Sequence, residues 1–169
     1  FLNSLGKLKV SIKDFSNIVI LGSGGVVLGI IETLIQKTNH RIDLHILRRN
    51  SKNDHKLTGI NSENLKCFLY DFEPSNLEFL MQKYTDQLVV QATSAPHQGD
   101  DLRGFVPAFK NFKGVFCDLV YGKPSSILDF CIKNNIINQD GLAMLIEQAM
   151  IAQKIWWGKF AYPEIKDLK

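Results

Sequence analysis

The chain has 169 residues, of which 45% are hydrophobic and 22% charged, as is usual for one globular domain with a substantial core. Its formal net charge of +3 is too small to indicate a nucleic-acid partner, and no dense group of lysines and arginines suggests a basic binding face. No apolar run approaches the roughly 18 residues that a membrane span needs. We therefore expect neither a nucleic-acid nor a membrane partner.

Strand-like and helix-like patterns alternate along the chain. We expect strands at 17–21, 41–47, 65–69, 87–91, 115–120 and 136–137. We expect helices at 26–36, 74–83, 125–133 and 141–157, the last with Asp140 as its N-cap, and the most loop-like stretch at 98–104. This order predicts a single domain with a Rossmann-type, doubly wound, mainly parallel six-stranded sheet and helices on both faces.

The most informative segment runs from Asn17 to Gly29 and reads NIVILGSGGVVLG. A strand, a glycine-rich turn and a helix in this order form the phosphate-binding part of a dinucleotide site. Gly22 permits a tight turn, and Gly24 lets the backbone approach a pyrophosphate. Val27 occupies the third place of G-x-G-x-x-G/A, so a turn that only packs helix against strand is the alternative.

The residues after the second expected strand indicate which dinucleotide binds. An NAD enzyme places an acidic residue there, on the ribose 2′-hydroxyl. This chain has Arg48, Arg49 and Lys52 instead, and such cations attract a 2′-phosphate. The pattern favours NADP over NAD as cofactor; the alternative is a solvated basic turn.

Two further groups of residues are candidates for a site. Thr93 and Ser94 follow the fourth expected strand, where small hydroxyl residues can bind a ligand or simply form a turn. Gly141, Met144 and Gln148 share one face of the last expected helix, where they can contact a flat ring and a hydroxylated substrate. The alternative is a core-facing stripe with one stray glutamine.

The three cysteines have no zinc-type spacing and cannot all pair with one another. We expect Cys67, Cys117 and Cys131 to be reduced, buried thiols of a cytoplasmic protein, and we expect no metal site.

Five segments match, in order, the motifs of one family: 22–26, 47–52, 91–94, 118–128 and 140–149. The last reads DGLAMLIEQA and is the most specific, because few other Rossmann proteins carry such a signature. On these motifs the chain resembles the C-terminal, NADP-binding lobe of shikimate dehydrogenase. Leu47 and Arg49 stand where the family has asparagine and threonine, and 95–97 replaces a stretch that usually contains Gly-Met.

The resemblance implies roles for individual residues. Those expected to bind the cofactor are Gly22, Ser23, Gly24, Gly25 and Val26 at the pyrophosphate, Arg48 and Lys52 at the 2′-phosphate with Leu47 and Arg49 as further contacts to the adenosine, Thr93 and Ser94 after the fourth strand, and Leu119, Gly141 and Met144 at the nicotinamide. Those expected to contact the substrate are Tyr121 and Gln148.

The resemblance also implies an activity, the reversible NADPH-dependent reduction of 3-dehydroshikimate to shikimate on the route to chorismate and the aromatic amino acids. The family's catalytic lysine and aspartate lie in an N-terminal lobe that no stretch of this chain matches. We therefore expect no catalytic residue here, residues 1–15 to be a hinge or helix remnant, and negligible turnover by the chain alone. A quinate/shikimate dehydrogenase and a non-catalytic NADP(H)-binding module are the alternatives, and monomer and homodimer both stay open.

Overall fold

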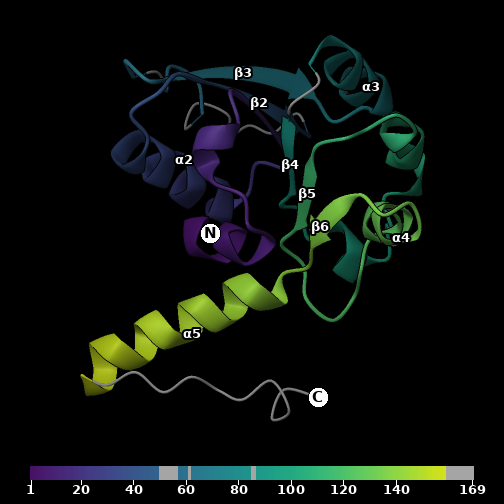
Figure 1. Ribbon diagram of the computed structural model, residues 1–169. Coiled ribbons are helices and arrows are strands. Elements are labelled where there is room, and N and C mark those ends of the chain that lie inside the picture. Colours follow the sequence, from purple (N-terminus) through teal and green to yellow (C-terminus); the bar gives the residue numbers. More distant parts are fainter. Residues whose placement is uncertain (50–56, 61, 85–86, 159–169) are drawn as a thin grey trace.

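A computed structural model of the chain describes residues 1–49, 57–60, 62–84 and 87–158 (Figure 1). The strands are β1 (Asn17–Leu21), β2 (Ile42–Arg48), β3 (Leu65–Asp71), β4 (Gln87–Gln91), β5 (Val115–Asp118) and β6 (Ile137–Gln139). They form a six-stranded sheet in the order β3-β2-β1-β4-β5-β6, and every neighbouring pair is parallel. This is the strand order of a doubly wound dinucleotide-binding fold, so the expected fold class is confirmed.

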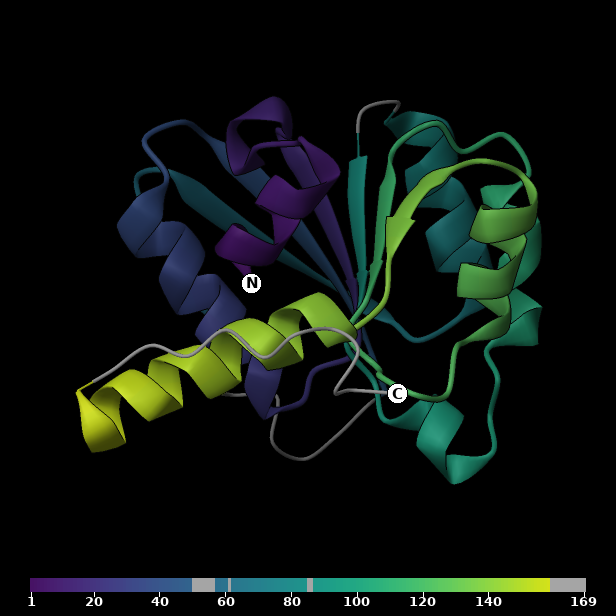
Figure 2. The same cartoon turned by 60° about the horizontal axis from the view of Figure 1, so that its bottom comes forward.

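Helices cover both faces of the sheet, as Figure 2 shows. The α-helices are α1 (Leu2–Leu5), α2 (Gly25–Lys37), α3 (Pro74–Lys83), α4 (Ser126–Lys133) and α5 (Leu142–Trp157). The short 3₁₀ helices are η1 (Gly6–Leu8), η2 (Ile12–Asp14), η4 (Ala95–Gln98) and η5 (Arg103–Phe109). The N-terminal segment and α2 lie on one face, and α3, η5 and α4 lie on the other.

The core consists of two apolar layers, one on each side of the sheet. Along β1, Ile18 and Ile20 point into the layer under α2, whereas Val19 and Leu21 point into the layer under α3 and α4. All four side chains are 0% exposed, which is why this strand reads as a continuous apolar run without polar alternation. Each such side chain stabilises the fold by about 1.5–3 kcal/mol.

Several expected boundaries differ from those in the structure. β5 ends at Asp118 rather than at 120, because the Asp118 carboxylate accepts a hydrogen bond from the Val120 backbone N–H and turns the chain away. α4 begins one residue later than expected, because the Ser125 hydroxyl caps it by accepting from the Leu128 N–H. The expected loop at 98–104 includes the end of η4 and the start of η5.

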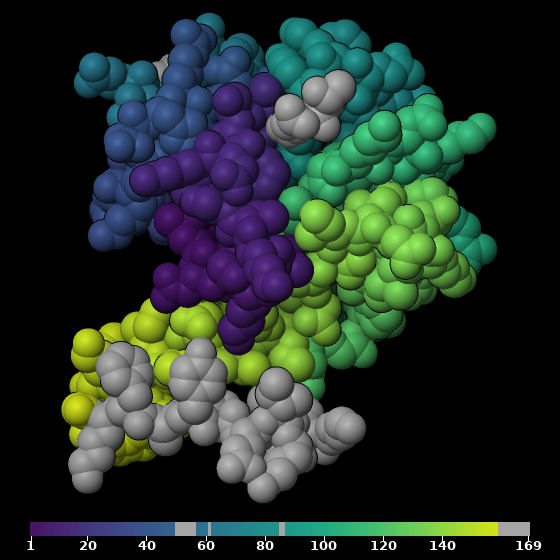
Figure 3. Space-filling model, in the orientation of Figure 1, coloured from purple at the N-terminus to yellow at the C-terminus, as the bar shows by residue number. Residues whose placement is uncertain are grey.

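The last helix, α5, is only loosely attached to the rest of the domain. Its N-cap is Gly141 rather than Asp140, although an Asp140 carboxylate oxygen accepts from the Leu142 N–H at 3.1 Å. Ile146 is the one buried residue that α5 contributes within the described part of the chain. Figure 3 shows the N-terminal residues directly against α5, where Asn3 donates to the Glu147 carboxylate at 3.2 Å.

The cysteines differ in environment. Cys117 and Cys131 are buried, as expected, whereas Cys67 is half-buried. Burial raises the pKa of Cys67 to about 11 and those of Cys117 and Cys131 to about 12, so all three are protonated thiols at neutral pH. Within the described residues, no helix is both long and apolar enough to span a bilayer.

Candidate functional site

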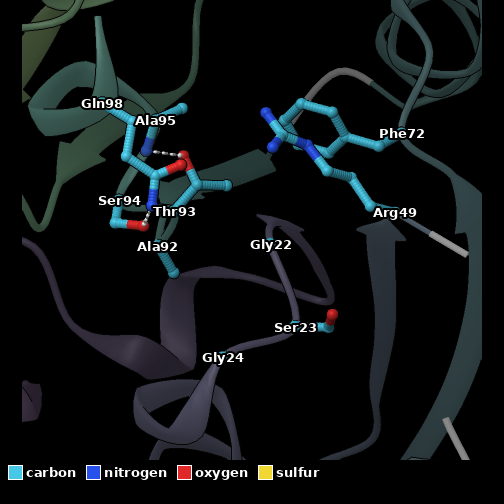
Figure 4. Close-up of a pocket in the computed structure, with 10 residues that line it drawn as sticks. All are labelled: Gly22, Ser23, Gly24, Arg49, Phe72, Ala92, Thr93, Ser94, Ala95 and Gln98. Atoms are coloured by element: carbon cyan, nitrogen blue, oxygen red, sulfur yellow. Dashed lines mark hydrogen bonds between the residues drawn. The ribbon is translucent and has the colours of Figure 1, made fainter. Parts of the chain in front are cut away.

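A pocket of about 230 Å³ lies beyond the carboxyl ends of β1, β2, β3 and β4. Figure 4 shows its lining residues, which are Gly22, Ser23, Gly24, Arg49, Phe72, Ala92, Thr93, Ser94, Ala95 and Gln98. β1 and β4 are the neighbouring strands at which the order of the sheet reverses, and ligands of such sheets bind at this crevice. The pocket is smaller than the roughly 300–1,000 Å³ of a whole ligand site, so it fits one part of a dinucleotide.

Gly22 is required by its backbone and by its neighbours. Its φ of +118° is a conformation that side chains rarely adopt, and a Cβ there would lie 2.9 Å from the Thr93 methyl carbon Cγ2 and 3.0 Å from the Ala92 carbonyl oxygen. Its N–H donates to the Leu47 carbonyl at 2.8 Å. The turn therefore lies tightly between the ends of β2 and β4.

The beginning of α2 has the properties of an anion site. Gly24 is its N-cap, no side chain caps it, and no acidic residue lies in its first turn. A Cβ on Gly24 would meet no protein atom within 4 Å, so the space beside this glycine is open to a ligand. Free N–H groups and the positive end of the helix dipole together favour a phosphate here.

The two described basic residues at the end of β2, Arg48 and Arg49, differ in position. Arg48 is half-buried at the end of β2, and Arg49 lines the pocket. The Arg49 guanidinium lies 5.5 Å from the centre of the Phe72 ring and 3.3 Å from an Asp100 carboxylate oxygen. Lys52 lies outside the described residues.

The segment after β4 is held by hydrogen bonds of its own side chains. Gln91 is 0% exposed; its side-chain oxygen accepts from the Thr93 N–H, and its amide nitrogen donates to the Thr93 carbonyl at 3.2 Å. The Thr93 hydroxyl accepts from the Ala95 N–H, and the Ser94 hydroxyl accepts from the Gln98 amide at 2.9 Å. These bonds fix the pocket wall opposite Arg49.

Asp118 is a buried carboxylate that joins this wall to the next loop. It accepts from the Ser125 hydroxyl at 2.7 Å, from the backbone N–H groups of Ser125 and Val120, and from the Gln91 amide at 3.4 Å. Burial raises the pKa of this carboxyl, while the bonds from Ser125 and Val120 oppose the rise. The network fixes the start and end of the segment that carries Leu119 and Tyr121.

Gly141 and Leu119 meet where β5 and α5 come together. The Gly141 N–H donates to the Val120 carbonyl at 3.1 Å, and a Cβ on Gly141 would lie 2.4 Å from the Leu119 carbonyl oxygen. The sequence suggested that this glycine makes room for a flat ring. The structure gives another reason, which is the close approach of its own backbone to residues 119 and 120.

The remaining candidates lie outside the pocket lining. Met144 is half-buried and Gln148 exposed on α5, and the Tyr121 side chain is exposed after β5. Leu47 is fully buried in the core and meets the turn only through its carbonyl. Gly25 and Val26 form the first turn of α2, next to the lining residue Gly24.

Sequence reasoning missed three residues of the pocket lining, Phe72, Ala95 and Gln98, and also Asp100, which pairs with the lining residue Arg49. Phe72 follows β3 directly, and its place at the carboxyl end of a strand could have indicated it. Gln98 and Asp100 reach the site through η4, a 3₁₀ helix that the sequence pattern did not predict. Among the described residues, no group of three or more histidine, cysteine and acidic side chains could hold a metal ion.

Comparison with known proteins gives relatives that are named shikimate dehydrogenase (NADP+). No family model matches the chain. It is 33% identical over 156 residues to a shikimate dehydrogenase (NADP+) of Acinetobacter baumannii, covering 90% of this chain and 54% of the relative. It is 34% identical over 146 residues to the enzyme of the same name from Acinetobacter baylyi, covering 85% of this chain and 51% of the relative. The chain thus spans about half the length of the curated relatives it matches.

Solved structures show the same fold. A shikimate 5-dehydrogenase from Listeria monocytogenes, in complex with shikimate and NAD, matches 98% of this chain and 59% of its own with a TM-score of 0.78 and 18% identity. Shikimate dehydrogenase of Mycobacterium tuberculosis matches 95% of this chain and 56% of its own with a TM-score of 0.71 and 18% identity. The solved structures thus confirm the fold, and the curated relatives show that the chain belongs to the shikimate dehydrogenase family.

Proposed function

We propose that the chain is the NADP(H)-binding lobe of a shikimate dehydrogenase, which reversibly reduces 3-dehydroshikimate to shikimate on the route to chorismate and the aromatic amino acids. One observation carries the cofactor assignment. The pocket joins an uncapped helix start and a glycine turn to Arg49, at the end of β2 where an NAD enzyme would have an acidic residue. The curated relatives named for NADP support the same assignment.

The described residues fit the adenosine diphosphate half of the cofactor. Residues 22–26 would hold the pyrophosphate, because they provide the tight turn, the open space beside Gly24 and the start of α2. Arg48 and Arg49 would bind the 2′-phosphate as charge-assisted donors, and we assign the same role to Lys52, which lies outside the described residues. Thr93 and Ser94 would face the cofactor from the opposite wall, which the Gln91 side chain keeps in place.

The nicotinamide would lie toward β5 and α5. Leu119, Gly141 and Met144 would line its site, and Tyr121 and Gln148 would donate and accept hydrogen bonds with the hydroxyl groups of the substrate. The bound cofactor supplies the hydride that passes between its nicotinamide ring and the carbon that bears the carbonyl. The hydrogen bonds of Asp118 to Val120 and Ser125 would hold the backbone around Leu119 in position for this transfer.

The proton would come from a lysine and aspartate pair in a second lobe. This part of the proposal is supported by the relatives, whose length is about twice what the chain covers. Residues 1–15 would then be the link toward that lobe, next to α5. We further place the reaction in the cytoplasm, where cysteines such as Cys67 remain reduced.

A turnover assay tests the division of labour between the lobes. The 169-residue chain, supplied with shikimate and NADP⁺, is expected to produce NADPH no faster than a protein-free blank, because hydride transfer also needs a positioned acid–base group. Production of NADPH above the blank by the chain alone would contradict the assignment of the catalytic pair to another lobe.

A non-catalytic NADP(H)-binding module is the second candidate. It is favoured by one observation, that the described lining of the pocket includes no carboxylate, imidazole or lysine. An NMR titration with shikimate in the presence of NADP⁺ separates the two candidates. Shifts around Tyr121 and Gln148 support the lobe of an enzyme, and unchanged spectra support the module.

A further inference from the structure

Arg49 crosses the open side of the pocket. It leaves the end of β2, lies over the Phe72 ring, and its Nη2 donates to Asp100 Oδ2 at 3.3 Å. Figure 4 shows the Arg49 side chain extending over Phe72 toward the wall that Ala95 and Gln98 form, with Gly22 across the pocket. Asp100 belongs to the segment between η4 and η5, so this ion pair bridges two sides of the pocket.

We infer that Asp100 is a built-in competitor for the phosphate that Arg49 binds, and thereby sets the affinity for the cofactor. The inference rests on the proposed function, because it takes the ligand to be a phosphate of NADP(H). A carboxylate and a phosphate bind the same N–H groups of a guanidinium, and both are anions. While Asp100 binds one N–H of Nη2, one of the two forks through which the guanidinium can hold a phosphate by parallel bonds is incomplete.

The exposure of the pair makes such an exchange feasible. The side chains of Arg49 and Asp100 are 62% and 53% exposed, so water and salt screen their attraction. Release of Asp100 leaves Arg49 stacked on Phe72, and the guanidinium therefore stays over the pocket when the carboxylate departs. An exposed pair of this kind changes an affinity by up to about fivefold.

The chain offers a matched control in the next residue. Asp100 and Asp101 each accept, through Oδ1, from the backbone N–H two residues later, at 3.1 Å in both cases. Each also pairs through Oδ2 with an arginine, at 3.3 Å for Asp100 and 3.2 Å for Asp101. The arginine partners differ, since Asp101 binds Arg103, which does not line the pocket, and the Asp101 carboxylate also has a hydrogen bond with the Ser126 side chain. Asparagine at either position keeps the backbone bond and removes one negative charge.

The experiment compares Asp100→Asn and Asp101→Asn in fluorescence titrations with NADPH and with NADH. Asp100→Asn is expected to tighten NADPH binding about two- to fivefold, and Asp101→Asn to leave it within about 1.5-fold of the wild type. Tightening confined to NADPH identifies the 2′-phosphate as the competing group, and equal tightening for NADH identifies the pyrophosphate. Unchanged or weaker NADPH binding by Asp100→Asn, or equal tightening by Asp101→Asn, overturns the inference.

A double variant tests whether the effect acts through Arg49. In an Arg49→Gln background, Asp100→Asn is expected to have no effect on NADPH affinity, because the arginine for which both anions compete is gone. The same tightening in that background would overturn the inference. A wild-type chain that binds neither nucleotide contradicts the proposed function, whereas a chain that binds NADPH but does not respond to Asp100→Asn contradicts only the competition.

Discussion

Gly22 and Gly24 contribute to the pocket in different ways, although they are two residues apart. Gly22 has a φ of +118° and is enclosed by Thr93 and Ala92, so a side chain there would strain the turn itself. A Cβ on Gly24 would meet no protein atom within 4 Å and would fill only the space that we assign to the pyrophosphate. A glycine-to-alanine substitution at each position therefore distinguishes an effect on folding, at Gly22, from an effect on cofactor binding, at Gly24.

We expect Gly22→Ala to lower the free energy of unfolding by about 1–3 kcal/mol, because it combines backbone strain with a close contact. We expect Gly24→Ala to lower that free energy by no more than about 1 kcal/mol, the cost of alanine at a helix N-cap, and yet to weaken NADPH binding at least tenfold, because the methyl group occupies ligand space. Urea unfolding and NADPH titration measure the two effects. Unaltered NADPH affinity in Gly24→Ala would contradict the position of the pyrophosphate.

His45 makes the stability of the domain depend on pH. Its ring is 1% exposed, stacks on Phe68 and lies 3.2 Å from the Tyr70 hydroxyl through Nδ1. Its Nε2 has no hydrogen-bond partner among the described residues, and burial lowers the pKa of His45 from 6.5 to about 4. Between these values the unfolded chain binds a proton that the folded chain does not, so stability falls as the pH decreases from 6.5 toward 4.

We expect His45→Leu to reduce this loss, which amounts to at most about 3 kcal/mol between pH 7 and pH 4, because the variant has no imidazole to protonate. The measurement is the free energy of unfolding in urea at pH 7, 5.5 and 4. A His45→Leu profile as steep as that of the wild type would assign the pH dependence to other groups.

Individual residues could be predicted from the sequence to different degrees. The glycine turn and Arg49 were predicted as parts of a site, and both line the pocket. The role of Asp100 could not be predicted, because its partner lies 51 positions away and the ion pair depends on the path of the loop between η4 and η5. The reason for a glycine at position 141 could not be predicted either, because the Leu119 carbonyl that excludes a Cβ lies in a different part of the chain, directly after β5.

Among the described helices and strands, α5 exposes the most large apolar side chains. Its outer surface exposes Leu145, Ile151, Ile155, Trp156 and Trp157, and Ile146 alone is buried in the described structure. The two tryptophans are the only ones in the sequence, and they are 71% and 66% exposed. Tryptophan fluorescence of this chain therefore reports on α5.

We expect Ile146→Ala to lower the free energy of unfolding by about 2 kcal/mol, because it removes most of a side chain that is only 6% exposed. Ile151→Ala is the matched control on the same helix; Ile151 is 52% exposed, and its loss should cost less than about 0.5 kcal/mol. Urea titrations followed by tryptophan fluorescence and by far-UV circular dichroism measure both variants. Equal destabilisation by the two substitutions would contradict the way α5 is attached.

Local sequence patterns predicted most elements well. β1, β4 and α3 have the expected bounds, because apolar periodicity and the residues that begin and end each element agree there. The 3₁₀ helices η4 and η5 were not predicted, because they contain Pro96 and Pro107 and are too short to show a helical period. The end of β5 depends on the Asp118 carboxylate, which accepts from the Val120 N–H two residues later and from the Gln91 amide on β4.

At the scale of the molecule, strand order determines where a cofactor can bind. The sequence predicted six strands and a mainly parallel sheet, but alternation alone does not fix the order in which strands pair. The order β3-β2-β1-β4-β5-β6 brings the glycine turn after β1 beside the Thr93 segment after β4. The pocket forms between them, and the residues expected at the nicotinamide and the substrate lie directly after β5 and at or in α5.

We propose that this domain binds NADP(H) and distinguishes it from NAD(H). The most direct measurement is a fluorescence titration of the chain with NADPH and with NADH at the same salt concentration. We predict that NADPH binds at least about tenfold more tightly, because its 2′-phosphate gains charge-assisted bonds from Arg48, Arg49 and Lys52. NADH that binds as tightly as NADPH would contradict the assignment of these basic residues, and no binding of either nucleotide would contradict the cofactor site itself.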